Sequence, residues 1–238
     1  MSDNKWFELT FKQIEPINIG QGGWGVVNET RIFIPGITMW GALTNEYFKI
    51  TGKHSEHIFE EISCFYPKID GKVLYPSYKN GELYLGDMSE SEFRQKYVKS
   101  FTSTAINPTS LNAKDESLHE IDLIYPNNIE WVGEWVGYIN CKKEYLDEIK
   151  KIYIGGDVRY GFGLMKLESI KEKNYNCNLI KGIYQTNNYK NPLKNYLKFN
   201  NQKFEGELEI LPEFDFTQGQ KIIKNAEYYI TTGSKLLE

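Results

Sequence analysis

A short stretch at residues 154–163 constrains the fold more than any other part of the chain. It holds four glycines, one arginine and two aromatic residues, between segments at 151–153 and 164–167 that both have strand-like patterns. Glycine accepts positive φ angles and lets a second backbone approach closely. The stretch therefore predicts either a tight turn between two strands or a loop that lies against another surface. No helix pattern follows it, so it does not predict a dinucleotide-binding loop.

The side chains of this glycine-rich loop suit a polyanion that carries exposed bases. Successive N–H groups in such a loop can form a pocket for an anion, and Arg159 adds a planar fork that suits phosphate. Tyr160 and Phe162 are two residues apart, so in an extended segment both rings would lie on one side and stack on unpaired bases. We expect Asp157 to close an Asx-type turn that leaves Arg159 free. The alternative is a hairpin turn with ordinary strand aromatics.

Charge is distributed unevenly along the 238 residues. The formal net charge of −4 argues against a nucleic-acid binder that relies on overall electrostatics. Residues 142–203, which include the glycine-rich loop, hold more than twice as many basic as acidic residues. A basic face on an acidic body is typical of a subunit whose other surfaces meet proteins. The alternative is a solvated lysine face without a ligand.

The cysteines predict reduced thiols. Cys64, Cys141 and Cys177 are far apart, odd in number and not in metal-ligand spacing, so we expect no disulfide, no metal site and no cofactor. The sequence contains no secretory signal and no apolar run of membrane length. We therefore expect a cytoplasmic protein without a membrane partner.

The remaining pattern predicts strands mixed with short helices. Residues 39–50 repeat apolar side chains at helical spacing with Thr38 as the expected cap, and Ser89 with Glu92 predicts a capping box for a helix at 89–97. A polar segment at 100–114 predicts a long loop or protruding hairpin. Residues 16–26 predict a second glycine-rich loop, residues 142–151 a short helix, and strands are expected at 6–12, 31–34, 119–125, 131–140, 179–184 and 228–232.

Four segments, in this order, resemble the RAMP superfamily of repeat-associated RNA-binding subunits of CRISPR systems. IFIPGITMWGAL at 32–43 is similar to its strand–turn–helix motif, and residues 103–127 resemble its protruding loop and the strand that follows. WVGEWVGYIN at 131–140 and GGDVRYGFGLMKL at 155–167 resemble the next strand and the superfamily's glycine-rich loop. YPKIDGKVLYPSY at 66–78 is similar to an element of the type III-D subunit that plays the five-prime-capping role.

This resemblance implies an α+β fold. It consists of a ferredoxin-like (RRM-like) core of antiparallel sheet and helices, a glycine-rich loop near the first helix, and an inserted, protruding hairpin. We expect this core at residues 1–167, with residues 168–238 as a C-terminal extension that packs on it or completes it. The resemblance also implies a subunit of a type III effector ribonucleoprotein in antiviral defence. Its expected partners are CRISPR RNA, held through backbone contacts and stacking, the other subunits, and target RNA as a further candidate.

The expected RNA contacts lie in both glycine-rich loops, at the helix entry and in the protruding loop. At three positions where the superfamily commonly has a basic residue the chain has Trp40, Thr44 and Pro108, which removes contacts on the N-terminal side. The predicted contact residues are Gly22, Gly23, Trp24, Gly36, Thr38, Lys114, Gly155, Gly156, Arg159, Tyr160, Gly161, Phe162, Gly163 and Lys166.

An RNA-cleaving enzyme is the first alternative, although we favour a non-catalytic subunit. Target-cleaving members of the superfamily resemble one another in an aspartate on the loop before the Pro-Gly turn, where this chain has Glu29 as its nearest carboxylate. Guide-processing members typically use a histidine. His57 with Lys53 is the best such grouping, ahead of His54 and His119.

A binding domain for carbohydrate or protein is the second alternative. The chain is rich in aromatic residues, with 17 Tyr, 13 Phe and 5 Trp, which favours strands and stacking surfaces. In this interpretation Trp24, Trp131 and Trp135 would form the platform.

Overall fold

A computed structural model describes residues 4–53, 57–115, 117–126, 130–186, 189–215 and 222–237 of the chain. Its largest sheet has six strands in the order β12–β13–β1–β11–β4–β5, and every neighbouring pair is antiparallel. The strands are β1 (Lys5–Gln13), β4 (Tyr66–Ile69), β5 (Lys72–Val73), β11 (Glu134–Cys141), β12 (Lys151–Tyr153) and β13 (Leu164–Glu172).

Four of these strands and two helices occur along the chain in the order β1–α1–β4–β11–α3–β13, with other elements between them; α1 is Gly36–Thr51 and α3 is Lys143–Asp147. In the sheet the four strands stand in the order β13–β1–β11–β4. A βαββαβ chain in this antiparallel order is the ferredoxin-like arrangement. The predicted α+β fold with a ferredoxin-like core is therefore confirmed.

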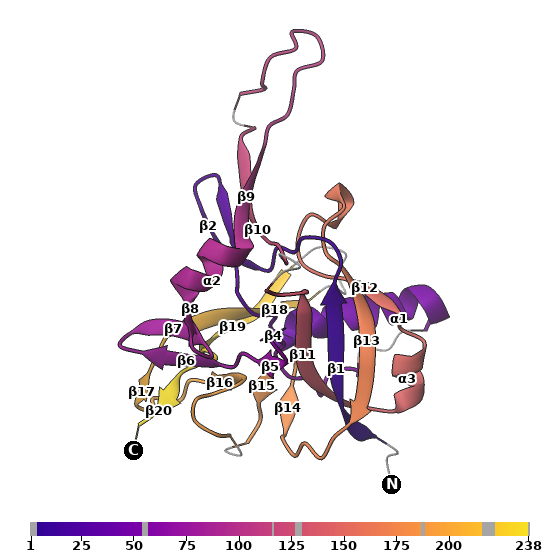
Figure 1. Cartoon of the computed structure of the whole chain (residues 1–238), viewed down its shortest axis with the longest axis vertical. Helices are drawn as coiled ribbons and strands as arrows, with labels where there is room; N and C mark the ends of the chain where they lie inside the picture. The colour runs from indigo at the N-terminus through magenta and orange to yellow at the C-terminus, as the bar shows by residue number, and fades with distance from the viewer. Residues whose placement is uncertain are drawn as a thin grey trace.

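Buried and more exposed side chains alternate along β1, and this alternation shows which face of the sheet the helices cover. Phe7, Leu9 and Phe11 are buried in the main core together with Met39 and Leu43 of α1. In Figure 1, α1 passes behind β1 and β13, on the face to which these side chains point. The intervening residues of β1 lie on the opposite face, because successive side chains of a strand point to opposite sides.

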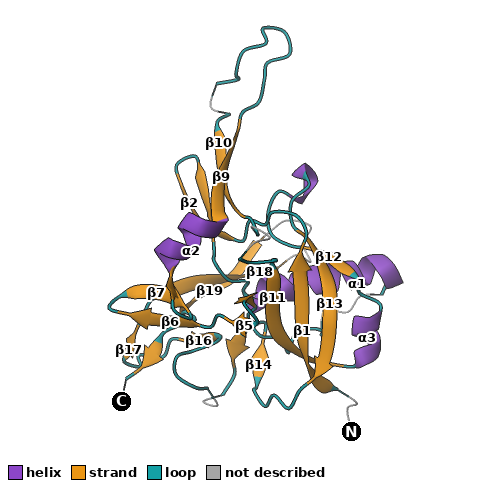
Figure 2. Ribbon diagram, viewed as in Figure 1, coloured by secondary structure: helices purple, strands orange, loops and turns teal. Residues whose placement is uncertain are grey.

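A second sheet, in the order β2–β3–β10–β9, carries a hairpin that projects from the molecule (Figures 1 and 2). The predicted protrusion at 100–114 is confirmed. Near its tip, Ile106 bridges Ala113, and the Lys114 N–H donates to the Ala105 carbonyl at 2.8 Å. Its strands are β2 (Gly20–Trp24), β3 (Val27–Thr30), β9 (Val98–Ser103) and β10 (His119–Ile124).

The remaining elements surround this core. Helix α2 (Glu90–Tyr97) begins with the predicted capping box, in which the Glu92 N–H donates to Ser89 Oγ and the Ser89 N–H donates to the Glu92 carboxylate. Nearby strands are β6 (Pro76–Lys79), β7 (Glu82–Leu85) and β8 (Met88–Ser89). The C-terminal strands are β14 (Leu179–Ile180), β15 (Ile183–Tyr184), β16 (Tyr196–Lys198), β17 (Phe204–Glu205), β18 (Leu208–Asp215), β19 (Ile222–Ile230) and β20 (Lys235–Leu236).

The C-terminal part packs directly against the start of α1. A Cβ atom added to Gly36 would lie 2.5 Å from the Gly182 Cα, so the two backbones touch where any larger side chain would clash. Tyr196 of β16 joins the main core, while a smaller cluster around Leu193 and Leu197 lies within the C-terminal part. β13 continues past residue 167 to Glu172, and the division of the chain at 167 stays a prediction.

Three local predictions are wrong. Thr38 does not cap α1, because the Pro35 carbonyl accepts the N–H groups of Thr38 and Met39 and the helix already begins at Gly36. Residues 31–34 form only an isolated bridge from Ile34 to Phe65 instead of a strand. Within the second glycine-rich segment, Gly20–Trp24 form strand β2, because these residues still pair with β3 in a ladder.

No helix among the described residues is long and apolar enough to cross a membrane. The three cysteines are free thiols, as predicted. Burial raises the pKa of the Cys64 thiol to about 12 and that of Cys141 to about 12, whereas Cys177 is only half-buried.

We expect a thiol reagent to modify Cys177 alone in the native protein at neutral pH. The thiolate is the reactive form, and Cys64 and Cys141 are both neutral and covered. Thiol titration followed by peptide mass spectrometry should find one modified cysteine before unfolding and three after it. Rapid native labelling of Cys64 would contradict this packing.

An ion pair connects the β2–β3 hairpin to the C-terminal sheet. Arg31 donates through both terminal nitrogens to the Glu209 carboxylate, and its Nε donates to the Gly20 carbonyl at 3.1 Å. The Tyr196 hydroxyl donates to Glu209 at 3.0 Å. Burial acts to lower the pKa of Arg31, but the negative charges beside it raise the pKa above its ordinary value. The guanidinium therefore stays charged in a site with little water.

Replacing Glu209 with alanine should lower the free energy of unfolding by about 3 kcal/mol, because it leaves a largely buried guanidinium without its counter-charge. Urea unfolding measures this change. Glu205→Ala, at an exposed glutamate on β17, removes the same charge and should change stability by less than about 0.5 kcal/mol. Equal effects of the two substitutions would mean that the Arg31 pair contributes nothing specific.

Candidate RNA-binding cleft

The glycine-rich loop leaves β12 at Ile154 and returns into β13 at Leu164. Its two sides are joined by a hydrogen bond from the Ile154 N–H to the Gly163 carbonyl at 2.9 Å. Between them the chain makes a short 3₁₀ turn, η1 (Val158–Tyr160). The loop does not stand free in solvent, because it rests on residues 16–18, which follow β1.

Close backbone contact explains why this loop is rich in glycine. Gly155 has φ +81°, and a Cβ atom there would lie 1.9 Å from the Asn18 carbonyl oxygen. The adjacent Gly156 N–H donates to that same oxygen at 3.0 Å. Of the two conformations predicted for the loop, the structure has the one in which it lies against another surface.

Asn18 links the loop to the protruding hairpin. Its carbonyl accepts the Gly156 N–H, and its side-chain amide donates to the Asp122 carbonyl of β10 at 2.8 Å. Asn18 is 6% exposed, so both interactions are shielded from water. The sequence offered one signal for this residue: an asparagine between two isoleucines in a segment that is otherwise apolar and rich in glycine.

Four of the loop N–H groups are already bonded within the protein, which limits the predicted anion pocket. The N–H groups of Gly156, Tyr160, Gly161 and Gly163 all donate to backbone carbonyls of the protein. Asp157 makes no capping hydrogen bond, and its carboxylate lies 3.9 Å from His119 Nε2 instead. The Arg159 side chain is exposed and remains available to an anion.

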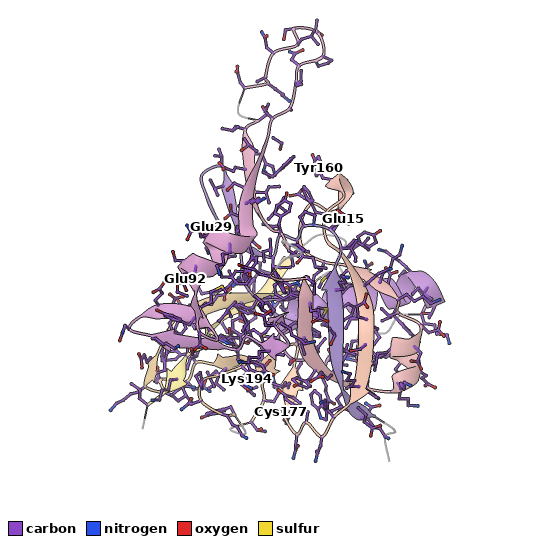
Figure 3. All side chains as sticks on the ribbon, viewed as in Figure 1. Glu15, Glu29, Glu92, Tyr160, Cys177 and Lys194 are labelled. Atoms are coloured by element: carbon purple, nitrogen blue, oxygen red, sulfur yellow. The ribbon has the colours of Figure 1, made fainter. Side chains whose placement is uncertain are left out.

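Tyr160 and Phe162 do not form the predicted stacking pair. The 3₁₀ turn and the positive φ of Gly161 break the extended geometry that would put both rings on one side. Phe162 packs edge-on against Phe101 of β9 with ring centroids 5.7 Å apart. Tyr160 is 73% exposed and lies near the base of the hairpin in Figure 3. The Phe162 ring therefore anchors the loop, and the Tyr160 ring is available to a ligand.

An open cleft of about 630 Å³ lies between α1 and the glycine-rich loop. The loop wall includes Asn18, Gly155 and Gly156. The helix wall consists of Ala42 and of Thr38, Gly41, Asn45 and Lys49. The last four positions recur every three or four residues, so they form one stripe of α1.

The walls of the cleft suit a phosphodiester backbone. They offer a hydroxyl, side-chain amides and the Lys49 ammonium, but no cluster of base-reading groups. Asn45 and Lys49 were absent from the predicted contacts, although their helical spacing from Thr38 is visible in the sequence. Arg159 follows Val158, which lines the cleft.

The other predicted contact residues lie elsewhere. Gly36 is buried against Gly182, so its role is in packing and it cannot contact RNA. Lys166 lies on the sheet face opposite the helices, and Lys114 is exposed in the protruding hairpin. Gly22, Gly23 and Trp24 belong to β2, and the Trp24 side chain lies outside the described part of the structure. The structure thus brings together only part of the predicted set, namely Thr38, Gly155 and Gly156.

The candidate catalytic residues are not gathered into one site. His57 Nδ1 lies 2.9 Å from Glu60, and Glu60 also pairs with Lys181 at 3.3 Å. Partial burial acts to raise the pKa of Glu60, but these hydrogen bonds lower it below its ordinary value, as expected of a carboxylate in an ion pair. Glu29 lies on β3 opposite Gly22, across the hairpin from Tyr160 in Figure 3. His54 falls outside the described residues, among which no three metal-ligating side chains converge.

The predicted tryptophan platform does not exist. Trp131 and Trp135 are 1% and 0% exposed, and their rings meet edge-to-face with centroids 5.4 Å apart. Both belong to the main core, where the Trp135 indole N–H donates to Gln13 at 3.0 Å.

No family model and no curated protein sequence matches the chain. Its fold is similar to that of a chain in the cryo-EM structure of the type III-B Cmr-beta bound to cognate target RNA and AMPPnP, with a TM-score of 0.64 and 14% identity over 96% of this chain and 85% of that one. A second structure, of the type III-B Cmr-beta bound to cognate target RNA, gives a TM-score of 0.61 and 13% identity over 96% and 86%.

At such low identity this likeness establishes the fold. The chain shares its fold with chains of these two type III-B Cmr-beta structures, which agrees with the fold that the sequence resemblance implied. The ligand of this chain has to be inferred from its own residues.

Gly155→Ala should disrupt the loop, because the added methyl group meets the Asn18 carbonyl and the φ angle disfavours any side chain. We expect a loss of about 1–3 kcal/mol in the free energy of unfolding. Gly156→Ala is the matched control: its Cβ would lie 3.4 Å from Asn18 Oδ1, and a change below about 0.5 kcal/mol is expected. Thermal or urea unfolding measures both. Equal stability of the two variants would rule out the close contact.

Proposed function

We propose that the chain is a non-catalytic RNA-binding subunit of a type III CRISPR effector complex. It holds guide RNA by the sugar–phosphate backbone in the cleft between α1 and the glycine-rich loop. The observation that carries this proposal is the position of the loop: it is fixed on Asn18 beside the polar stripe of α1 and at the foot of the hairpin.

The chemistry of the cleft supports binding without sequence preference. Lys49 and Arg159 supply positive charge, while Thr38 and Asn45 supply neutral hydrogen-bonding groups. Contacts of this kind position a strand but do not read its bases. The exposed Tyr160 ring can stack on any base, because every base has a π-face.

The likeness in fold to chains of complexes bound to target RNA supports a role in an effector. The protruding hairpin suits such an assembly. Ile106 and Leu111 near its tip are 64% and 79% exposed, and neither contributes to the core of this chain. Contacts with other subunits would cover these apolar side chains.

One observation favours RNA cleavage as a second candidate function. His119 Nε2 lies 3.9 Å from the Asp157 carboxylate, two residues before the exposed Arg159. An imidazole oriented by a carboxylate can act as a general base, and a guanidinium can stabilise the charge of a phosphorane. His119→Ala separates the two functions: loss of cleavage with RNA binding unchanged would establish the enzyme, and absence of cleavage in the wild type would exclude it.

The proposal predicts that Lys49→Ala and Arg159→Ala each weaken binding of a single-stranded RNA by about fivefold at low salt. Each removes a cation from the cleft or its rim, so the slope of log K against log salt should fall by about 0.7 per lost contact. Fluorescence anisotropy with the full chain measures both quantities.

Lys72→Ala provides the control. Lys72 is an exposed lysine on β5, at the opposite edge of the sheet from β12. The control should bind RNA as the wild type does, and scrambling the RNA sequence should change the affinity little. Unaltered binding by both cleft variants, or no binding by the wild type, would contradict the proposal.

A further inference from the structure

Three lysines lie side by side on the face of the main sheet that the helices do not cover. Lys12 of β1 is directly opposite Lys166 of β13, and Lys166 is directly opposite Lys151 of β12. Residues in register on neighbouring strands point to the same face. We call Lys12, Lys151 and Lys166 the lysine row. Lys151 and Lys166 are exposed and Lys12 is half-buried.

Nothing within the described chain neutralises the lysine row. No ion pair joins any of its three members to another described residue, and like charges placed directly opposite one another destabilise a sheet. The one acidic residue in the same register is Glu134 of β11, opposite Lys12. Glu134 already pairs with Lys68 of β4 at 3.0 Å, so the row keeps its excess positive charge.

The charge imbalance is confined to this register. Further along the same face, Glu8 is opposite Lys171 and lies 4.0 Å from Lys173, so positive and negative charges alternate there. Beside the lysine row, Thr10 is buried, and Ser169 directly opposite it is half-buried, so Ser169 is the one of the two hydroxyl residues that can donate to an anion. The sheet thus carries a short cationic line with one neutral donor beside it.

The lysine row and the cleft lie on two sides of the same edge strand. β12 is the outermost strand of the sheet, and it continues directly from Lys151 through Tyr153 into the glycine-rich loop. Tyr153 lines the cleft, and its ring also lies 5.8 Å from the Lys151 ammonium. A strand of nucleic acid that leaves the cleft at this end can cross β12 and reach the row without a break in contact.

We infer that the lysine row binds the phosphates of an RNA strand that continues from the cleft over β12 onto the open sheet face. This inference rests on the proposed function and extends it. Neighbouring strands are about 4.8 Å apart, so the three lysines span about 10 Å, and their flexible stems let them reach successive phosphates. Continuity with the cleft favours RNA over an acidic protein segment as the anion.

The test compares two RNA lengths on the full chain. A single-stranded RNA of about 6 nucleotides fills the cleft alone, whereas one of about 30 nucleotides also reaches the sheet face. In the variant with Lys12→Ala, Lys151→Ala and Lys166→Ala, affinity for the long RNA should fall by about tenfold or more at low salt, and its salt slope should fall by about 2. Affinity for the short RNA should stay within about twofold of the wild-type value.

A second triple variant removes the same charge from other surfaces. Lys72→Ala, Lys203→Ala and Lys235→Ala change exposed lysines away from the row and should leave the length dependence intact. The row variant should also unfold at the same temperature as the wild type or a higher one, because it relieves repulsion between like charges.

Each other outcome overturns the inference in a different way. Equal losses for short and long RNA would place the lysines in the cleft's own binding. An unchanged affinity for long RNA, together with weaker binding of polyglutamate, would assign the row to an acidic protein partner. Absence of wild-type binding to either RNA would overturn the proposed function itself.

Lys166→Glu, which pairs with both neighbours and retains the fold, should reproduce the loss for long RNA on its own.

Discussion

The contact between the glycine-rich loop and the Asn18 carbonyl determines how the other functional parts are arranged. It places the loop beside α1, which creates the cleft, and the Asn18 side chain binds β10, which fixes the hairpin to the same point. A backbone contact of this kind has little freedom, because its partners cannot rotate away as side chains can. The cleft walls therefore keep their spacing without a ligand, and little ordering has to accompany binding.

The small number of positive charges in the cleft suits a subunit that holds RNA together with several other subunits. Lys49 and Arg159 are few cations for a free-standing RNA binder, and the chain as a whole carries a net charge of −4. Modest contacts become strong when several modules hold one strand, because each additional contact is made at high effective concentration. Under the proposed function, a weak, sequence-independent cleft is sufficient in that setting, and it avoids nonspecific capture of other nucleic acids.

Most of the fold could be predicted, and the errors have a common origin. The alternation of β1, the helical spacing in α1 and the Ser89 capping box are local signals that predicted single elements. The ferredoxin-like core was implied by the resemblance of four segments, in order, to a known superfamily. The predictions that failed concern residues whose contacts lie far away in the sequence. Nothing near Trp131 or Trp135 in the sequence shows that the core encloses them. The rings of Tyr160 and Phe162 do not lie on one side, because Asp157 and Gly161 both adopt positive φ angles and fold the loop into a 3₁₀ turn. The Asn18 contact likewise joins segments far apart in the chain.

The paired glycines at the start of α1 and in the C-terminal part have an evolutionary consequence. Gly36 and Gly182 touch backbone to backbone, so a substitution at either position creates a clash that no substitution at the other can relieve. Among descendants that keep this packing, both positions should remain glycine even after the surrounding sequence has diverged beyond recognition. Two invariant glycines, one in a Pro-Gly turn before a helix and one between two short late strands, would therefore mark distant relatives that share the C-terminal arrangement as well as the core.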